Sequence, residues 1–198
     1  MTGTVPVATL SAATRTARLD IEPLRSMHAP ALFPVLADPR IYAYVPDRLH
    51  ETVESLADRF AILERGAPAG TSEVWLNWAL RRADTGACIG TLQATVTPDS
   101  HAYIGYTLGP PAWGHGFASE ACDWLVAQLI RRYVLSEIQA TVDVRNVRSI
   151  RVLERVGFDR IGTEPAELRG QATTDYRYRL DGAPAIAAVP DPTARCVR

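Results

Sequence analysis

Apolar and polar residues alternate in three short stretches near the middle of the chain. In the first stretch, Val74, Leu76, Trp78 and Leu80 fall on one face of an extended segment, a period of two that is typical of a β-strand. Short turns containing glycine, proline or aspartate separate the stretches. The three predicted strands are Val74–Leu80, Cys88–Val96 and Ala102–Leu108. Because their connections are short, we expect an antiparallel meander.

A helical period begins directly after Gly116. Apolar residues recur at intervals of three and four and form a single stripe made of Ala118, Ala121, Cys122, Leu125, Val126, Leu129, Ile130 and Tyr133. Such a stripe predicts a helix that packs on a sheet. The helix leads to the next predicted strand, Ile138–Val144. A helical crossover of this kind predicts that the strand runs parallel to Ala102–Leu108.

Weaker patterns predict the remaining elements. The helices expected are His28–Leu36, Glu51–Glu64 and Ser149–Arg155, the strands are Arg18–Pro23, a segment opening at Phe158 and Thr174–Leu180, and Pro39–Pro46 is expected as an irregular link. Asn146 occupies a helix N-cap position, and Gly157 is placed to end the same helix. The fold class is therefore α/β, a mixed sheet with helices on both faces.

Composition limits the class of protein. The chain has 198 residues, of which 47% are hydrophobic, and this suits one globular domain. We expect a flexible arm over residues 1–16, a domain over 17–181 and a flexible tail over 182–198, since both ends are rich in small residues or proline. The net charge of -1 provides no field to recruit nucleic acid or a membrane surface.

The residues that are missing narrow the chemistry and the compartment. The chain has no lysine, so a P-loop lysine and a pyridoxal phosphate Schiff base are excluded. The histidines form no H-E-x-x-H motif, and we expect no metal. Three widely spaced cysteines, Cys88, Cys122 and Cys196, together with the absence of a secretory signal or an apolar span, favour the cytoplasm.

A glycine-rich turn joins the third strand of the meander to the helix. Gly114-His115-Gly116 directly precedes the helix start. Glycines allow a tight turn and a close approach to main-chain N–H groups, and the first helical turn leaves such groups unpaired. The pattern predicts a phosphate or diphosphate site. A tight connection that binds no ligand would have the same sequence.

Two motifs resemble those of the GCN5-related N-acetyltransferases (GNAT), in the branch of the ribosomal-protein N-terminal acetyltransferases (RimJ/RimL-like). The first is Ile104-Gly105-Tyr106-Thr107-Leu108 followed by Trp113-Gly114-His115-Gly116-Phe117-Ala118 and Glu120-Ala121. The second is Asn146-Val147-Arg148-Ser149, then Val152-Leu153-Glu154-Arg155 and Gly157-Phe158. The resemblance covers roughly residues 17–181. It implies a largely antiparallel central sheet and acetyl-CoA as the acyl donor, without a metal.

The resemblance also assigns candidate binding residues. Backbone groups of Tyr106, Thr107 and Leu108 would pair with the pantetheine arm, as an added strand would. The turn and first helical residues would bind the pyrophosphate, namely Trp113, Gly114, His115, Gly116, Phe117, Ala118 and Ser119. Asn146 would bind the pantetheine or the acetyl end, unless it is only a helix cap. Arg148, Arg151 and Arg155 either reach the coenzyme phosphates or are solvated surface residues.

The proton-transfer groups are less clearly marked. By the same resemblance, Ser149 is a candidate acid near the coenzyme sulfur, or else a surface serine. Other branches of the family have a tyrosine that protonates the thiolate, and Leu153 occupies that position here. The strand Ala102–Leu108 carries no carboxylate, so Glu73 and His101 are the nearest candidate bases, acting through a water. An α-amine, with a pKa of about 7.7–8.0, needs less help from a base than a lysine amine at about 10.4.

These considerations favour transfer of an acetyl group to a protein N-terminal α-amine. One alternative is a small amine or antibiotic, held by residues 28–65 and a loop over residues 163–175, where Glu164, Glu167 and Asp175 would attract a cation. Another is a CoA-binding sensor without catalytic activity. A homodimer is possible, and no nucleic-acid or membrane partner is expected.

Overall fold

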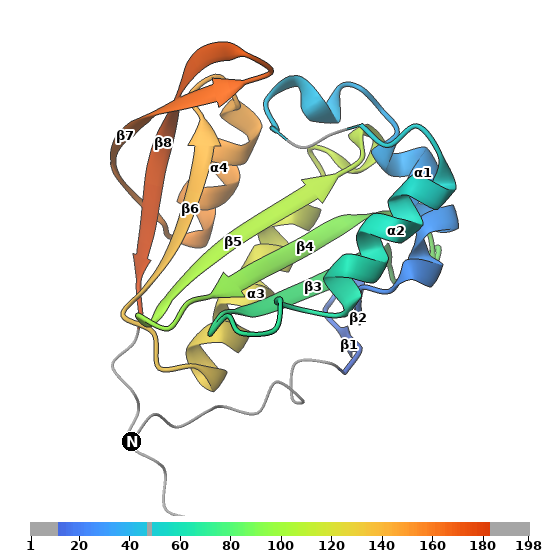
Figure 1. Ribbon diagram of the computed structural model, residues 1–198, viewed down its shortest axis with the longest axis horizontal. Coiled ribbons are helices and arrows are strands. Elements are labelled where there is room, and N and C mark those ends of the chain that lie inside the picture. Colours follow the sequence, from blue (N-terminus) through green and yellow to red (C-terminus); the bar gives the residue numbers. More distant parts are fainter. Residues whose placement is uncertain (1–11, 47–48, 183–198) are drawn as a thin grey trace, which may run out of the picture.

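A computed structural model describes residues 12–46 and 49–182 of the chain. Eight strands form one sheet in the order β1-β2-β3-β4-β5-β6-β8-β7 (Figure 1). Their bounds are β1 Thr14–Arg15, β2 Leu19–Pro23, β3 Val74–Arg82, β4 Cys88–Val96, β5 His101–Leu108, β6 Glu137–Asp143, β7 Asp159–Leu168 and β8 Gln171–Asp181. Neighbouring strands are antiparallel except β5 and β6, which are parallel. The predicted meander and crossover are thereby observed.

Helices cover both faces of the sheet. Their bounds are α1 Ala29–Leu36, α2 Val53–Glu64, α3 Phe117–Arg132 and α4 Val147–Val156, with short 3-10 turns at Ser26–His28, Ile41–Ala43 and Pro110–Ala112. In Figure 1, α1 and α2 lie in front of the sheet, and α3 and α4 lie behind it. The predicted fold class, α/β with a mixed and largely antiparallel sheet between helices, is confirmed.

The core is divided by the sheet into two clusters. On the α3 side, Cys122, Leu125 and Leu129 are fully buried against residues of the central strands, including Trp78. The predicted stripe of α3 is therefore the face that packs on the sheet, and the predicted face of β3 lies opposite it. On the other side, Leu32 of α1 and Phe60 of α2 form a smaller cluster. The two clusters hold the sheet from both faces.

The helix ends follow from local chemistry. The Thr52 side chain accepts a hydrogen bond from the Ser55 backbone N–H at 3.1 Å, which caps α2. Asn146 caps α4 in the same way, and Gly157 ends that helix with a φ of 100°. A left-handed residue at this place is nearly free of strain only as glycine. Both end signals were visible in the sequence.

Two parts of the chain differ from the prediction. The segment expected as a loop over residues 163–175 belongs instead to a β-hairpin formed by β7 and β8. Exposed residues lie on both faces of β7, so it lacks the one-sided alternation that reveals a half-buried strand. Thr14 and Arg15 of the expected arm form a short strand beside β2. Residues 1–11 of the expected arm and 183–198 of the expected tail lie outside the described residues.

The strands β5 and β6 diverge partway along the sheet. Their pairing covers only His101–Tyr103 and Glu137–Gln139. Beyond Tyr103, β5 continues beside β4 while β6 continues beside β8, and the two strands separate in Figure 1. The edge of β5 from Ile104 to Leu108 consequently has no partner strand on that side. No helix among the described residues is long and apolar enough to cross a membrane.

Candidate active site

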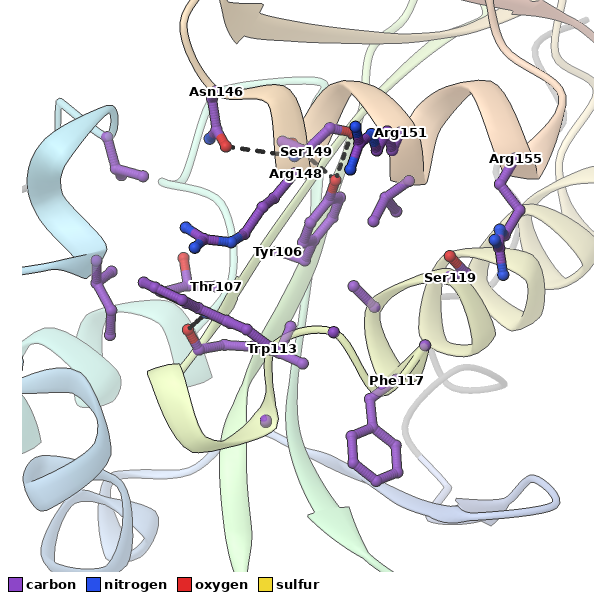
Figure 2. Close-up of a pocket in the computed structure, with 18 residues that line it drawn as sticks. Tyr106, Thr107, Trp113, Phe117, Ser119, Asn146, Arg148, Ser149, Arg151 and Arg155 are labelled. Atoms are coloured by element: carbon purple, nitrogen blue, oxygen red, sulfur yellow. Dashed lines mark hydrogen bonds between the residues drawn. The ribbon is translucent and has the colours of Figure 1, made fainter.

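A pocket of about 430 Å³ lies where β5 and β6 diverge, between the open edge of β5, the start of α3 and α4 (Figure 2). Most of the residues singled out in the sequence line it. They are Tyr106, Thr107, Leu108, Trp113, Gly114, Gly116, Phe117, Ala118, Ser119, Asn146 and Ser149. Residues from β5, the glycine turn and α4, distant in sequence, thus share one pocket.

The glycine turn gives the pocket exposed backbone donors. Gly114 and Gly116 have φ values of 77° and 79°, which residues other than glycine rarely adopt. Gly116 is the N-cap of α3, and no side chain caps this helix. The first-turn N–H groups of α3 are therefore available at the positive end of the helix dipole. This turn can bind an anion.

Arg18 holds the turn in place from behind. Its Nη1 donates to the carbonyl of His115 at 2.7 Å, and its Nε donates to Glu120 at 2.7 Å. Its guanidinium also lies 4.9 Å from the centre of the Phe117 ring. His115 does not line the 430 Å³ pocket, and its carbonyl is occupied by Arg18. The sequence prediction missed Arg18, because nothing local to Arg18 indicates a contact 97 residues away.

Arginines make the pocket wall on α4 positive. Arg148, Arg151 and Arg155 recur at intervals of three and four and all line the pocket, so they share one face of the helix. The Arg148 guanidinium lies 4.7 Å from the Trp113 ring, a cation–π contact. In Figure 2, Arg148 extends over Trp113 and Arg155 points toward Ser119 of α3. The pocket therefore combines side-chain charge with backbone donors.

Two residues near the end of β5, Tyr106 and Leu108, turn their backbone groups toward the open edge. The Gly109 N–H donates to the carbonyl of Ile89 in β4. Along a strand, the N–H and C=O groups of successive residues point to alternate sides. Thr107 consequently faces β4, whereas Tyr106 and Leu108 face the open edge. The Leu108 carbonyl already accepts from the Trp113 indole at 2.7 Å. Of the residues expected to make backbone contacts, Tyr106 and the N–H of Leu108 thus face the open edge, while the backbone of Thr107 pairs with β4.

Tyr106, Ser149 and Asn146 form a small hydrogen-bonded group at the inner end of the pocket (Figure 2). The Tyr106 hydroxyl lies 2.7 Å from Oγ of Ser149. Asn146 Oδ1 accepts from the Ser149 backbone N–H at 3.3 Å. Because only its oxygen caps the helix, the amide NH₂ of Asn146 is left for a ligand. Burial raises the pKa of Tyr106 above its ordinary value, so this hydroxyl is neutral at physiological pH.

A second cavity, of about 500 Å³, lies on the other face of the sheet beneath α2. Leu36, Leu56 and Phe60 provide apolar walls, and the charged lining residues are Arg59 of α2, Asp143 of β6 and Asp175 of β8. Both cavities share five residues, which are Val45, Tyr106, Thr107, Asn146 and Ser149. The two cavities therefore meet at the gap between β5 and β6.

Two aspartates of the second cavity differ in their surroundings. Asp143 is buried and accepts from Arg145 Nε at 2.8 Å and from Thr173 Oγ1 at 2.9 Å. The hydrogen bonds from Arg145 lower the pKa of Asp143 to about 2. Burial, with Asp143 and Glu164 nearby, raises the pKa of Asp175 above its ordinary value. Of the two, Asp143 is firmly ionised and Asp175 is the easier to protonate.

The structure does not bring Glu73 and His101 to either cavity. Glu73 precedes β3 and accepts from the Trp75 indole at 2.8 Å, and His101 lies between Asp99 and Glu137. The strand register places both at the opposite end of the sheet. His101 is five residues from Tyr106 along β5, about 17 Å at the rise of a strand. The prediction of these two as bases is corrected, since neither reaches the gap.

Among residues 12–46 and 49–182, no group of three or more His, Cys, Asp or Glu residues is arranged to bind a metal ion. The chemistry of the site is thus built from hydroxyls, an amide, carboxylates, arginines and backbone N–H groups. Such a set can bind a phosphorylated ligand in one cavity and hold a second reactant in the other. Transfer between the two would occur at the shared residues.

Comparison with protein families identifies this arrangement. Residues 18–159 match the acetyltransferase (GNAT) domain, and the chain belongs to the GNAT family. It is 29% identical over 149 residues to the uncharacterized N-acetyltransferase YoaA of Bacillus subtilis (strain 168), covering 74% of this chain and 82% of that protein. The protein is therefore an enzyme, an acetyl-CoA-dependent N-acetyltransferase.

Solved structures share the fold at lower identity. The ribosomal-protein-S5-alanine acetyltransferase of Vibrio fischeri superposes with a TM-score of 0.75 and 18% identity, covering 87% of this chain and 97% of that one. The spermidine N-acetyltransferase of Vibrio cholerae, in complex with CoA and spermine, superposes with a TM-score of 0.71 and 16% identity. The match covers 87% of this chain and 100% of that one. One fold therefore serves acetyltransferases named for a protein substrate and for a polyamine.

Proposed function

We propose that this enzyme transfers the acetyl group of acetyl-CoA to the α-amine of a protein or peptide N-terminus. One observation carries the proposal. The 430 Å³ pocket and the 500 Å³ cavity share Tyr106, Thr107, Asn146 and Ser149. A thioester in the first cavity and an amine in the second would meet at these residues, and such positioning supplies much of the rate of an acyl transfer.

The donor fits the first pocket group by group. The diphosphate binds the N–H groups that begin α3, and the arginines of α4 balance its charge. The pantetheine arm pairs with the Tyr106 backbone at the open edge of β5, and the Asn146 amide NH₂ donates to one of its carbonyls. This places the sulfur at the inner end, near Ser149. The coenzyme thus lies in the gap left by β6.

The leaving group needs little help. A thiol has a pKa of about 8.5, so the thiolate leaves readily when the amine attacks the carbonyl carbon. The Ser149 hydroxyl donates its hydrogen toward the sulfur. The Tyr106 hydroxyl lies 2.7 Å from Ser149 Oγ, and either oxygen can donate in this hydrogen bond. When Tyr106 donates, Ser149 is held in place with its own hydrogen free for the sulfur. Ser149 contacts the reacting atoms, and Tyr106 acts through it as a positioning residue.

An α-amine suits this site better than a lysine side chain. At neutral pH, roughly one α-amine in ten is unprotonated, compared with roughly one lysine amine in 2,500. A site with carboxylates but no strong base therefore handles an α-amine more easily. The Vibrio fischeri enzyme that shares the fold is named for acetylating an alanine of a ribosomal protein, which is consistent with this acceptor.

A polyamine is the second candidate acceptor, because Asp143 and Asp175 both face the second cavity. Arg145 neutralises Asp143, however, and Arg59 lines the same cavity. The charges facing the cavity are therefore close to balanced. A ligand with several ammonium groups would require a more negative wall, so the α-amine remains the favoured acceptor.

A panel of amines tests the proposal. Peptides beginning with alanine, serine or methionine would be compared with Nα-acetylated peptides that carry an internal lysine, and with spermidine. Thiol release and mass spectrometry would report transfer from acetyl-CoA. We expect transfer to free N-termini and little to the blocked peptides. Turnover of spermidine without turnover of any peptide would overturn the choice of acceptor.

A further inference from the structure

Asp175 lines the second cavity beside Asp143. It lies on β8, opposite Asp143 of β6 on one side and Glu164 of β7 on the other. It lines the 500 Å³ cavity together with Asn146 and Ser149, which also line the donor pocket. An acceptor held in this cavity next to Ser149 therefore shares the cavity with the carboxylate of Asp175.

Of the three neighbouring carboxylates Asp143, Asp175 and Glu164, only Asp175 has no partner among the described residues. Asp143 is bound by Arg145 and Thr173, and Glu164 lies 3.6 Å from Arg177. Within the described part of the chain, the Asp175 carboxylate has no hydrogen bond or ion pair, although the Arg145 charge acts on it from nearby. A half-buried carboxylate without a partner is costly unless a ligand supplies one.

The other walls do not supply that partner. Tyr44, His50 and Arg59 face the cavity from the segment that joins α1 to α2 and from α2 itself. Tyr44 lies 5.6 Å from the guanidinium of Arg145, and His50 is hydrogen-bonded to Ser55. The remaining wall residues of α1 and α2, including Leu36, Leu56 and Phe60, are apolar. A positively charged group is therefore stabilised at the Asp175 side of the cavity.

We infer that Asp175 binds the ammonium group of the acceptor and removes a proton from it, directly or through one water, before the amine attacks the thioester. This inference rests on the proposed transfer to an amine. Nearby negative charge and burial raise the pKa of Asp175, which makes it a better proton acceptor than a solvated aspartate. Asp143, with its lowered pKa, is poorly suited to the same role.

The protons balance in this scheme. The ammonium group gives one proton to the Asp175 carboxylate, which later releases it to solvent. The neutral amine then forms the N–C bond as the C–S bond breaks, and the nitrogen loses its second proton. The thiolate gains one proton, through Ser149, and leaves as CoA. The products are the acetylated amine, CoA and one released proton.

The test compares Asp175→Asn with wild type on a peptide that wild type acetylates. We expect kcat/KM at pH 7 to fall by about 10². The loss should shrink to a few-fold near pH 9.5, because the amine is then already neutral, and Asp175→Glu should recover part of the activity at pH 7. Asp181→Asn is the matched control, since Asp181 is on the same strand, is exposed and lines neither cavity.

Separate outcomes distinguish the inference from the proposed function. The CoA Kd, measured by calorimetry, should be equal in wild type and Asp175→Asn. Suppose that wild type acetylates a peptide but that kcat/KM of Asp175→Asn falls less than three-fold, or falls by the same factor at every pH. The inference on Asp175 then fails, and the proposed function stands. If wild type acetylates spermidine alone, the choice of acceptor fails, and the same pH comparison on spermidine decides the role of Asp175.

Discussion

The hydroxyl of Tyr106 lies 2.7 Å from Oγ of Ser149, although 43 residues separate them in the chain. The contact joins β5 to α4 across the gap through which the donor pocket and the second cavity meet. Because burial raises the pKa of Tyr106, this hydroxyl is neutral and can donate a hydrogen bond as well as accept one. The pair therefore holds two hydroxyls together where the proposed function puts the coenzyme sulfur.

If this pair acts as a unit, its mutations should not be additive. We expect Ser149→Ala to lower kcat about 10-fold, less than a typical general acid contributes, because the thiolate leaves readily. Tyr106→Phe should lower kcat several-fold, and the double variant should be no slower than Ser149→Ala. Thiol release at saturating acetyl-CoA would measure all three.

Glu73→Gln provides the control for this set. The Glu73 carboxylate accepts a hydrogen bond from the Trp75 indole and lies outside both cavities. The turnover of Glu73→Gln should therefore match that of wild type between pH 6 and 9. A double variant whose loss equals the product of the two single losses would show that Tyr106 and Ser149 act independently.

The glycine turn makes a prediction about coenzyme affinity. Gly114 and Gly86 have similar left-handed φ values, 77° and 70°, and a Cβ added at either would touch nothing within 4 Å. The backbone strain of Gly114→Ala and Gly86→Ala should therefore be alike. At Gly114, however, the methyl group projects from a residue that lines the donor pocket.

We expect Gly114→Ala to weaken CoA binding at least 10-fold while Gly86→Ala leaves it unchanged. Gly116→Pro should weaken it as strongly, because proline removes an N–H and cannot adopt a φ of 79°. Calorimetry on folded samples would measure the Kd values. Equal affinities in Gly114→Ala and Gly86→Ala would contradict the assignment of this turn to the diphosphate.

Asp143 links stability to pH. Its pKa of about 2 in the folded protein is below its ordinary value, so the ionised form is favoured by folding. Its contribution is complete above the unfolded pKa of about 3.9 and is lost as the pH falls toward 2. We expect Asp143→Asn to reduce the free energy of unfolding at pH 7 on the order of 1–2 kcal/mol.

Urea unfolding at pH 7 and pH 3 would test this. The difference between wild type and Asp143→Asn should be clearly smaller at pH 3. Asp159→Asn, an exposed position at the start of β7, should change stability little at either pH. A difference of the same size at both pH values would mean that the ion pair with Arg145 is not the source of the stability.

The sequence predicted most of the residues that line the 430 Å³ pocket, because the relevant signals are local. Each of these signals depends on residues that are close together in the sequence. They are the alternation along β3, the apolar stripe of α3, the glycines before α3 and the Asn146 cap. The second cavity was harder to predict. Its walls come from α2, β6 and β8, and no local pattern says that these segments face one another.

The sequence by itself determined most of the sheet, the helices and the glycine turn before α3, because hydrophobic period and backbone freedom act over short distances. Only the tertiary structure decided which polar side chains face the reaction. Glu73 and His101 lie near the predicted strands in sequence, yet the strand register places them at the far end of the sheet. Arg18 and Asp175 reach the site from opposite ends of the chain, because long-range packing, which no local pattern encodes, sets which side chains line a cavity.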